Sequence, residues 1–328
     1  MRRYKRQEEL LPTSLSEALS LPCKQFFKCS IPLTVLFSAG PTYLSAWLAV
    51  RALTLLTPKT RQMFCSFDDF IWSSYQRLIL FFAENWTHTE VLFYGDADRL
   101  VHQGKTIKEN TIFMCNHQCS FDWIVADMVA VRFNCLGNIR YVLKSSLRFI
   151  PLYGYYFKQH GCVYVKRGGY DADSYKMQLL NLAKKDVFWL VIFPEGTRYS
   201  AQKKKVIEAN QKYAEKFGLP TFDFVLTPRH RGFYHAMQSL EDHVDAVYDV
   251  TIAYEPPGWK PDGNQPRPPS IASYLTGSTS KVHIHMERIP RQDIPTDEAK
   301  FSAWLCERFR IKNEFVNLLS GIFTCFFF

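Results

Sequence analysis

The residues best suited to chemistry in this sequence are a histidine and an aspartate in the run Asn-His-Gln-Cys-Ser-Phe-Asp. His117 and Asp122 lie between an apolar stretch that predicts a strand, 111–115, and a periodic stretch that predicts a helix, 123–132. A neutral imidazole, with an ordinary pKa near ~6.5, can accept a hydroxyl proton at neutral pH. A carboxylate bonded to its other nitrogen would fix the tautomer. We therefore predict a general base with an orienting carboxylate, although this spacing alone is common without any catalytic role.

A second polar run follows the most apolar stretch of the chain. Residues 188–193 read Phe-Trp-Leu-Val-Ile-Phe, which predicts a strand covered on both faces, and Pro-Glu-Gly-Thr-Arg comes next. The carboxylate of Glu195 and the guanidinium of Arg198 would emerge at the end of this strand. A planar guanidinium suits bidentate recognition of phosphate. Because α/β proteins bind ligands at strand ends, we predict that both polar runs contribute to one site; a turn with a surface salt bridge is the alternative for the second run.

Apolar runs alternate with amphipathic stretches between residues 91 and 310, which predicts an α/β fold with a mixed central sheet flanked by helices. We expect strands over 111–115, 162–165, 188–193, 224–226, 250–254 and 281–287, and helices over 123–132, 175–184 and 301–315. Six prolines with Gly and Ser predict a surface loop over 256–280. His283 and His285 alternate with apolar residues in the last strand, which predicts a solvated polar face rather than a metal site.

Both ends of the chain suggest contact with a membrane. Residues 1–28 are polar and basic, whereas 29–50 carry no charge and are long enough to cross a bilayer as a helix. We interpret 29–90 as a membrane-anchoring helical region, in which the apolar stretch 70–83 lies on the membrane or pairs with the first helix. A buried core helix is the alternative for the anchor. The tail 311–328 is apolar but short, which suggests a segment that dips into the membrane or a spanning helix cut short.

Charge and cysteine content narrow the class of protein. The 328 residues carry a net charge of +9 and are 16% aromatic, which favours polyanionic ligands or acidic lipid surfaces. Nucleic-acid binding is disfavoured, because the basic residues are dispersed and no recognition module is visible. The nine cysteines are scattered and form no Cys-x-x-Cys clusters, which indicates reduced thiols and argues against zinc. The sequence also lacks the Gly-x-Ser-x-Gly motif of ordinary serine hydrolases.

These motifs resemble the ordered sequence blocks of the glycerolipid acyltransferases, the family that includes the 1-acylglycerol-3-phosphate acyltransferases. The blocks are Asn-His-x4-Asp at 116–122, Gly-Cys-Val-Tyr-Val-Lys-Arg at 161–167, Phe-Pro-Glu-Gly-Thr-Arg at 193–198 and Val-Leu-Thr-Pro at 225–228. Four blocks in this order argue against coincidence. Within the family the chain is most similar to the epsilon-type lysophosphatidic acid acyltransferases and the neighbouring lysocardiolipin-type enzymes, and the intact Glu-Gly-Thr-Arg favours the former.

The resemblance implies a fold, an activity and roles for individual residues. It implies the glycerolipid acyltransferase fold and direct transfer of an acyl chain from acyl-CoA, as co-substrate, to the sn-2 hydroxyl of lysophosphatidic acid, with no cofactor or metal. It implies His117 as the base and Asp122 as its orienter. The implied substrate-binding residues are Asn116, Lys144, Arg167, Glu195, Gly196, Thr197, Arg198 and Pro228. Of these, Arg167 and Arg198 would bind the acceptor phosphate.

Other interpretations of the same residues remain as alternatives for the substrate, the activity and the location. The acceptor is alternatively lysocardiolipin or lysophosphatidylglycerol, and the same histidine and aspartate in a lipid hydrolase would act on water. A phospholipid-binding protein without catalytic activity is a third alternative. Cys115 and Cys119 flank the histidine, so a thiol nucleophile is a further alternative. The resemblance further implies the endoplasmic reticulum membrane as location, with the mitochondrial outer membrane as the alternative.

Overall fold

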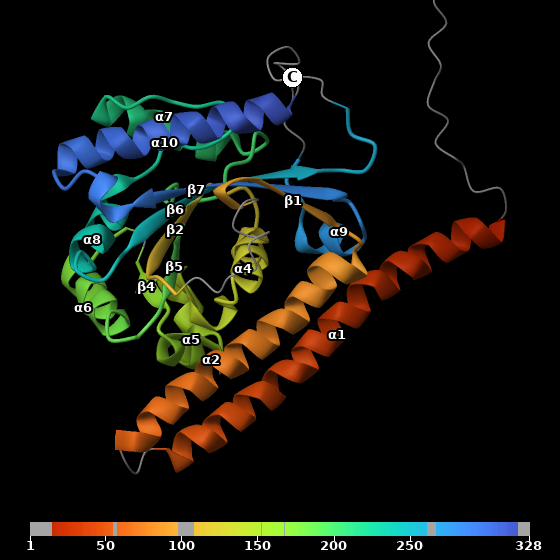
Figure 1. The fold of residues 1–328 in the computed structure, drawn as a ribbon. Coiled ribbons are helices and arrows are strands. Elements are labelled where there is room, and N and C mark those ends of the chain that lie inside the picture. Colours follow the sequence, from red (N-terminus) through yellow and green to blue (C-terminus); the bar gives the residue numbers. More distant parts are fainter. Residues whose placement is uncertain are drawn as a thin grey trace, which may run out of the picture.

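A seven-stranded sheet with helices on both faces forms the body of the protein (Figure 1). The structure is a computed structural model and describes residues 15–54, 58–97, 108–151, 153–166, 168–260 and 267–320. The strand order is β1-β7-β6-β2-β5-β3-β4. Parts of the predicted basic N-terminus and of the predicted apolar C-terminal tail, 1–14 and 321–328, lie outside the described residues.

The strands are β1 (Glu90–Gly95), β2 (Thr111–Cys115), β3 (Ile139–Lys144), β4 (Val163–Val165), β5 (Trp189–Ile192), β6 (Ala246–Glu255) and β7 (Lys281–Pro290). The α-helices are α1 (Leu15–Leu53), α2 (Pro58–Leu80), α4 (Asp122–Arg132), α5 (Tyr153–His160), α6 (Ala172–Leu182), α7 (Lys204–Phe217), α8 (His230–Ser239), α9 (Ile271–Leu275) and α10 (Glu298–Leu319). The other helical segments are the π-helix η1 (Phe81–Trp86) and the 3-10 helices η2 (Leu136–Asn138), η3 (Ser145–Phe149) and η4 (Arg291–Asp293).

Five neighbouring strands point their carboxyl ends to the same edge of the sheet. β2 pairs in parallel with β5 and β6, and β3 pairs in parallel with β5 and β4. β7 runs antiparallel to β6, and β1 is parallel to β7. The predicted mixed sheet flanked by helices is therefore confirmed. Because the two polar runs begin where β2 and β5 end, they emerge side by side at this edge.

The central strands are buried on both faces, which explains their continuous apolar sequences. In β2, Ile112 and Met114 pack in one cluster with α6, α8 and α10, whereas Phe113 and Cys115 pack in a second cluster with α1, α2 and α4. The side chains of β5 alternate in the same way. Figure 1 shows α7 and α10 on one side of the sheet, with α4 and the α1–α2 hairpin on the other. The sheet is thus the middle layer of three.

Most of the predicted elements are confirmed to within a few residues. They correspond to β2, β4, β5, β6 and β7 and to α4, α6 and α10. β3 has no counterpart among the predicted strands, because its sequence contains the charged Arg140, whose side chain is nevertheless fully buried and bonded to Asp69. An internal arginine hides the apolar pattern by which a buried strand is normally found.

The strand predicted at 224–226 is absent. The N–H of Phe224 donates to Oδ1 of Asn313 at 2.8 Å, and the N–H of Leu226 donates to Oε2 of Glu195 at 3.1 Å. Side chains, rather than a neighbouring strand, therefore satisfy this backbone. The prediction was wrong because an apolar run does not reveal where its backbone groups find partners.

The predicted surface loop over 256–280 contains a short helix, α9, in which Tyr274 and Leu275 are buried. Ser270 caps it by accepting the N–H of Ser273 at 3.1 Å, in a reciprocal capping box. Tyr274 of α9 is fully buried, stacks on Phe121 with ring centroids 3.8 Å apart, and donates its hydroxyl to the carbonyl oxygen of Ala83 at 3.0 Å. This part of the predicted loop is thus a packed element, which the prolines around it concealed.

The predicted solvated face of β7 is also wrong for His283. Its ring is buried, with Nδ1 2.8 Å from the hydroxyl of Tyr94 and Nε2 3.0 Å from Glu255. Phe315 of α10 packs on the rings of Tyr94 and His285. The α10 helix covers this face, which the alternation within the strand could not show.

The last helix of the sheet domain extends past residue 311, where the sequence predicts the start of an apolar tail. α10 continues to Leu319, and its Lys312 and Val316 are buried. The Lys312 ammonium donates to the carbonyl oxygen of Val250 at 2.5 Å and pairs with Asp249. Residues 311–319 therefore belong to the sheet domain.

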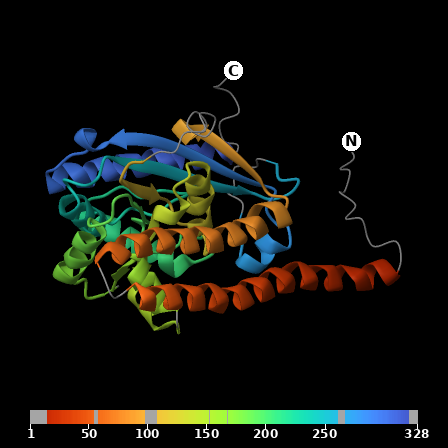
Figure 2. The same cartoon turned by 60° about the horizontal axis from the view of Figure 1, so that its bottom comes forward.

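The α1–α2 hairpin lies along one flank of this domain (Figures 1 and 2). α1 continues through Pro32 and Pro41, and its segment Cys23–Leu53 is, within the described residues, one helix long and apolar enough to cross a membrane. Only 17% of its apolar window is buried, and large side chains such as Phe26 and Phe37 are exposed. Length and composition alone make it a candidate span, and the predicted pairing of the second apolar stretch with the first helix is confirmed.

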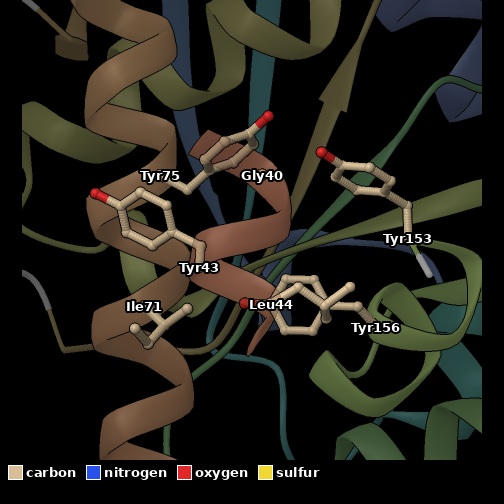
Figure 3. A pocket seen from close by; sticks show the side chains of 7 residues that line it. All are labelled: Gly40, Tyr43, Leu44, Ile71, Tyr75, Tyr153 and Tyr156. Carbon is tan, nitrogen blue, oxygen red and sulfur yellow. The ribbon is translucent and has the colours of Figure 1, made fainter. Parts of the chain in front are cut away.

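Close packing joins the hairpin to α5. Gly40 of α1 faces Tyr153 of α5, and an added Cβ would lie 1.8 Å from the Tyr153 hydroxyl oxygen. A small cavity remains between α1, α2 and α5, lined by Gly40, Tyr43, Leu44, Ile71, Tyr75, Tyr153 and Tyr156 (Figure 3). The absent side chain at residue 40 thus permits the approach of α5.

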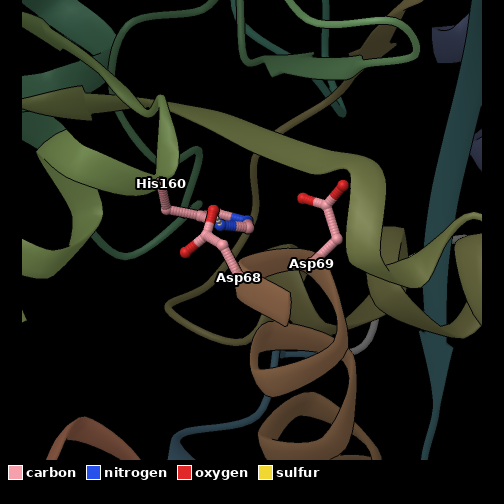
Figure 4. A group of neighbouring side chains, drawn as sticks. All are labelled: Asp68, Asp69 and His160. Carbon is pink, nitrogen blue, oxygen red and sulfur yellow. Dashed lines mark hydrogen bonds and ion pairs between the residues drawn. The ribbon is translucent and has the colours of Figure 1, made fainter. Parts of the chain in front are cut away.

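Ion pairs and hydrogen bonds of Asp68 and Asp69 connect the hairpin to the sheet domain (Figure 4). Asp68 of α2, 2% exposed, accepts hydrogen bonds from Nε1 of Trp47 at 2.7 Å and from Nδ1 of His160 at 2.9 Å. Its neighbour Asp69 accepts one from Arg140 of β3 at 2.6 Å. Each carboxylate therefore links α2 to a different element of the domain.

The same cluster holds three side chains of metal-ligand type, Asp68, Asp69 and His160. Arg140 pairs with Asp69, however, and the Lys185 ammonium lies 3.7 Å from Asp68. Two cations already balance the two carboxylates, so the cluster is best described as an ion-pair network.

The buried state of His160 predicts a pH dependence of stability. Burial lowers the pKa of His160 to about 4, whereas the same imidazole in the unfolded chain titrates near 6.5. Between these values the unfolded state binds the extra proton, so the free energy of unfolding falls as the pH drops from about 6.5 to about 4, by roughly 3 kcal/mol. Thermal unfolding in detergent across this window should show the loss, and His160→Gln should flatten it. Equal slopes for the two proteins would contradict the assignment.

Candidate active site

His117 and Asp122 form a hydrogen-bonded pair at the carboxyl edge of the sheet. Nδ1 of His117 lies 2.7 Å from Oδ2 of Asp122, and the Asp122 side chain is fully buried while that of His117 is 19% exposed. Asp122 is the first residue of α4, where the N-terminus of a helix favours negative charge. The turn between β2 and α4 therefore folds the carboxylate back onto the imidazole.

Five hydrogen bonds hold the Asp122 carboxylate. Oδ2 accepts the N–H groups of Gln118 at 2.6 Å and of Cys119 at 2.9 Å in addition to the imidazole. Oδ1 accepts the hydroxyl of Tyr254 at 2.7 Å and the thiol of Cys119 at 3.1 Å. With both oxygens engaged, the carboxylate has one orientation, and it presents Oδ2 to His117.

The orientation of His117 leaves Nε2 available. A carboxylate can only accept, so Nδ1 carries the hydrogen of the neutral ring. The imidazole stacks on Phe193, with ring centroids 4.4 Å apart and planes at 28°. Within the part of the chain that the structure describes, Nε2 has no hydrogen-bond partner, and the ring is partly exposed. Nε2 is therefore positioned to accept a proton from a bound hydroxyl.

The two cysteines beside the histidine are poorly suited to act as nucleophiles. Both are buried, and burial raises the pKa of the Cys115 and Cys119 thiols well above the ordinary value. The Asp122 carboxylate raises both further. A thiol that stays protonated is a weak nucleophile, so the geometry disfavours the thiol alternative.

Glu195 joins the loop of His117 to the segment that contains Leu226. It is buried, with Oε1 accepting the N–H of His117 at 2.7 Å and Oε2 accepting the N–H of Leu226 at 3.1 Å. Burial raises its pKa, and the two backbone N–H groups oppose this. The N–H of Tyr199 in turn donates to the His117 carbonyl oxygen at 2.7 Å. The position of Glu195 therefore favours a role in holding His117 rather than direct contact with a ligand.

Asn116 and Pro228, expected to bind substrate, also lie in the framework of the site. The fully buried Asn116 amide donates to the carbonyl oxygen of Ile252 at 3.0 Å and accepts the Ile252 N–H at 2.8 Å, which extends the pairing of β2 with β6. Pro228 is buried, and the next N–H, that of Arg229, donates to the carbonyl oxygen of Pro194 at 2.9 Å. Neither side chain faces an open space in this structure.

Other expected site residues lie on the open side. Arg198 is exposed, and its Nη1 donates to the hydroxyl of Ser120 in the loop that carries His117. Gly196 has φ +67°, a conformation that glycine adopts without strain, and Thr197 follows it half-buried. Lys144 is exposed at the carboxyl end of β3. The expected phosphate ligand Arg167 lies outside the described residues.

Sequence reasoning missed Tyr254, Phe193 and Ser120. Each contacts the histidine, its aspartate or the arginine beside them. Phe193 and Ser120 lie within the recognised motifs, so motif membership was a usable signal for them. Tyr254 lies more than a hundred residues from Asp122, and only the pairing of β6 with β2 brings it there.

Comparisons with known proteins show which proteins this chain is similar to. The model of the acyltransferase family matches residues 97–255, and that of the acyltransferase C-terminus matches residues 273–319. The chain is 41% identical over 285 residues to 1-acyl-sn-glycerol-3-phosphate acyltransferase epsilon of Mus musculus, covering 86% of this chain and 75% of that protein. It is 34% identical over 252 residues to probable 1-acyl-sn-glycerol-3-phosphate acyltransferase 5 of Arabidopsis thaliana, covering 76% and 62%. A crystal structure of the 1-acyl-sn-glycerophosphate acyltransferase PlsC from Thermotoga maritima aligns with a TM-score of 0.47 at 15% identity, over 89% of this chain and 97% of that one.

The contacts of Glu195 predict that Glu195→Gln loosens the loop that carries His117. One of the two backbone N–H groups would then face an amide N–H₂ instead of an acceptor, at a cost of about 1 to 3 kcal/mol. Hydrogen exchange should show faster exchange at the amides of His117 and Leu226, with a lower melting temperature. Glu208→Gln on the exposed face of α7 is the control. Unchanged exchange at both amides would show that Glu195 does not hold this loop.

Proposed function

The chain belongs to the acyltransferase family that includes the 1-acyl-sn-glycerol-3-phosphate acyltransferases, and from this we propose that it acylates the sn-2 hydroxyl of lysophosphatidic acid with acyl-CoA as donor. The product is phosphatidic acid, an intermediate of phospholipid biosynthesis. The observation that carries the proposal is the His117–Asp122 pair, which leaves Nε2 of His117 open to a hydroxyl, with the exposed Arg198 bonded to Ser120 of the same loop.

The arrangement supports direct transfer. Nε2 of His117 takes the proton of the acceptor hydroxyl as its oxygen attacks the thioester carbonyl carbon. The carbon–oxygen bond forms, the carbon–sulfur bond breaks, and the CoA thiolate leaves with the proton held on the imidazolium. Asp122 stabilises that imidazolium through Nδ1 at 2.7 Å. Neither a covalent acyl-enzyme nor a cofactor is needed.

The acceptor phosphate is assigned to the basic residues at the open side of the site. Arg198 donates to the hydroxyl of Ser120, three residues after the histidine, so its charge lies next to the loop that carries the base. Lys144 extends from the neighbouring carboxyl end of β3, and Arg167 belongs to the same proposed group. A guanidinium is well matched to a phosphate monoester.

Lipid acceptors and products place the reaction at a membrane surface. We infer that α1, with exposed side chains such as Phe26, Phe37 and Leu53, contacts the bilayer. The proposed location is the endoplasmic reticulum membrane, with the mitochondrial outer membrane as the alternative. Fractionation of tagged full-length protein distinguishes the two.

His117→Ala should abolish most of the transfer. General base catalysis contributes roughly 10² to 10⁴-fold, so kcat should fall by about that factor while binding to phospholipid vesicles is retained. The assay supplies one acyl-CoA with lysophosphatidic acid, lysophosphatidylglycerol or lysocardiolipin and identifies the product by mass. Free fatty acid instead of a newly acylated phospholipid would indicate a hydrolase, and an unchanged rate in the variant would indicate that His117 is not the base.

Arg198→Ala tests the phosphate assignment. Loss of a hydrogen bond to a charged group costs about 1.5 to 3 kcal/mol, so kcat/KM for lysophosphatidic acid should fall by roughly 10- to 150-fold, mainly through KM. Activity toward an uncharged monoacylglycerol should not change by more than about 2-fold. Arg310→Ala, at an exposed arginine of α10, is the matched control. An equal loss for the charged and the uncharged acceptor would refute a role in phosphate binding.

A further inference from the structure

Tyr254 of β6 contacts the His117–Asp122 pair on its buried side. Its side chain is on β6, 5% exposed, and its hydroxyl donates to Oδ1 of Asp122 at 2.7 Å. Burial, the Asp122 charge and Cys119 raise the pKa of the Tyr254 hydroxyl well above its usual value. The phenol is therefore a permanent donor to the carboxylate, but it lies too deep to touch a substrate.

The pairing of β6 with β2 fixes the position of the Tyr254 hydroxyl. Cys115 at the end of β2 pairs with Val250 of β6, and Val250, Ile252 and Tyr254 pack in the cluster that includes α4. Beyond the Cys115–Val250 pair, the side-chain amide of Asn116 forms hydrogen bonds with both the carbonyl oxygen and the N–H of Ile252. The strand is therefore held against β2 up to two residues before Tyr254, which places the phenol beside the first turn of α4.

The two oxygens of Asp122 depend on different parts of the protein. The backbone donors to Oδ2, Gln118 and Cys119, belong to the same loop as His117 and would move with it. Oδ1 has Tyr254 and the Cys119 thiol, and a thiol is a weak donor. Tyr254 is thus the strong donor that ties the carboxylate to the sheet rather than to its own loop.

We propose that Tyr254 is a positioning residue, which holds the Asp122 carboxylate so that Oδ2 keeps the His117 imidazole aligned for proton transfer. The inference rests on the proposed acyl transfer for its kinetic consequence but not for its effect on the histidine. Without the phenol, Oδ1 keeps only the thiol, and the carboxylate gains rotational freedom and basicity. A more basic carboxylate stabilises the imidazolium, so His117 titrates at a higher pH.

Other titratable groups near the dyad stay in place when only the phenol oxygen is removed. They are Cys119 on Asp122, Glu195 on the His117 backbone, Arg198 on Ser120, Cys115 at the end of β2, and the Lys312–Asp249 pair on α10 and β6. A change in the titration of His117 in Tyr254→Phe therefore reports the loss of the hydrogen bond between Tyr254 and Asp122.

The kinetic test compares Tyr254→Phe with Tyr248→Phe in the full-length protein. Tyr248 is a buried tyrosine of the same strand, but its hydroxyl donates to Glu109 away from the dyad. Tyr254→Phe should lower kcat by roughly 10- to 100-fold, the worth of a hydrogen bond to a charged group, with both KM values within about 2-fold. The acidic limb of its kcat/KM profile should move up by about 0.5 to 1 pH unit, whereas Tyr248→Phe should leave that limb unchanged.

A double variant tests whether Tyr254 acts through Asp122. If it does, Tyr254→Phe with Asp122→Asn should be no slower than Asp122→Asn alone, because the hydrogen bond has already lost its charged acceptor. Additive losses, or a pH limb that does not move, would overturn the proposal.

NMR titration of His117 separates this inference from the proposed reaction. The imidazole signal, assigned by its absence in His117→Gln, should titrate higher in Tyr254→Phe than in the wild type or in Tyr248→Phe, with or without any acyl transfer. An unchanged His117 titration in a folded Tyr254→Phe protein refutes the positioning role. Absence of acylated product from the wild type would instead refute the proposed function.

Discussion

A single buried carboxylate, that of Asp122, is the interaction on which the site depends. It sits at the start of α4 and accepts hydrogen bonds from two backbone N–H groups, an imidazole, a phenol and a thiol. A buried charge without such partners would be costly, so the surrounding structure must supply them together. The turn after β2, the first turn of α4 and the end of β6 are consequently locked to one another. The His117 imidazole is therefore held at Nδ1 and left open at Nε2.

Much of what surrounds this carboxylate positions backbone rather than substrate. Glu195 ties the histidine loop to the segment at Leu226, and Asn116 ties the end of β2 to β6. These side chains are polar yet buried, and each satisfies backbone groups that the strands leave open where they end. The open side carries the exposed basic residues Arg198 and Lys144. The site thus has buried, hydrogen-bonded polar side chains on one side and exposed basic side chains on the other, an arrangement suited to an acidic headgroup.

The sequence was sufficient for the fold class, for most strands and for the pairing of His117 with Asp122, because short-range patterns determine these features. It was insufficient where partners come from distant segments. Tyr254 and the buried His283 depend on strand order, which no local period records. Arg140 concealed β3, because the charge that compensates it, Asp69, belongs to a helix 71 residues away. The roles of the substrate-binding residues stay predictions, and the buried positions of Asn116 and Glu195 narrow what those roles are.

The fastening of α2 by Asp68 and Asp69 has a consequence for biosynthesis. Both carboxylates leave the ribosome long before their partners in β3 and α5, Arg140 and His160, exist. Until then both carboxylates lack these partners, and their charges oppose burial of this part of α2 deep within lipid. The chain must therefore be synthesised as far as His160 before both of the side-chain links that join α2 to the sheet domain can form.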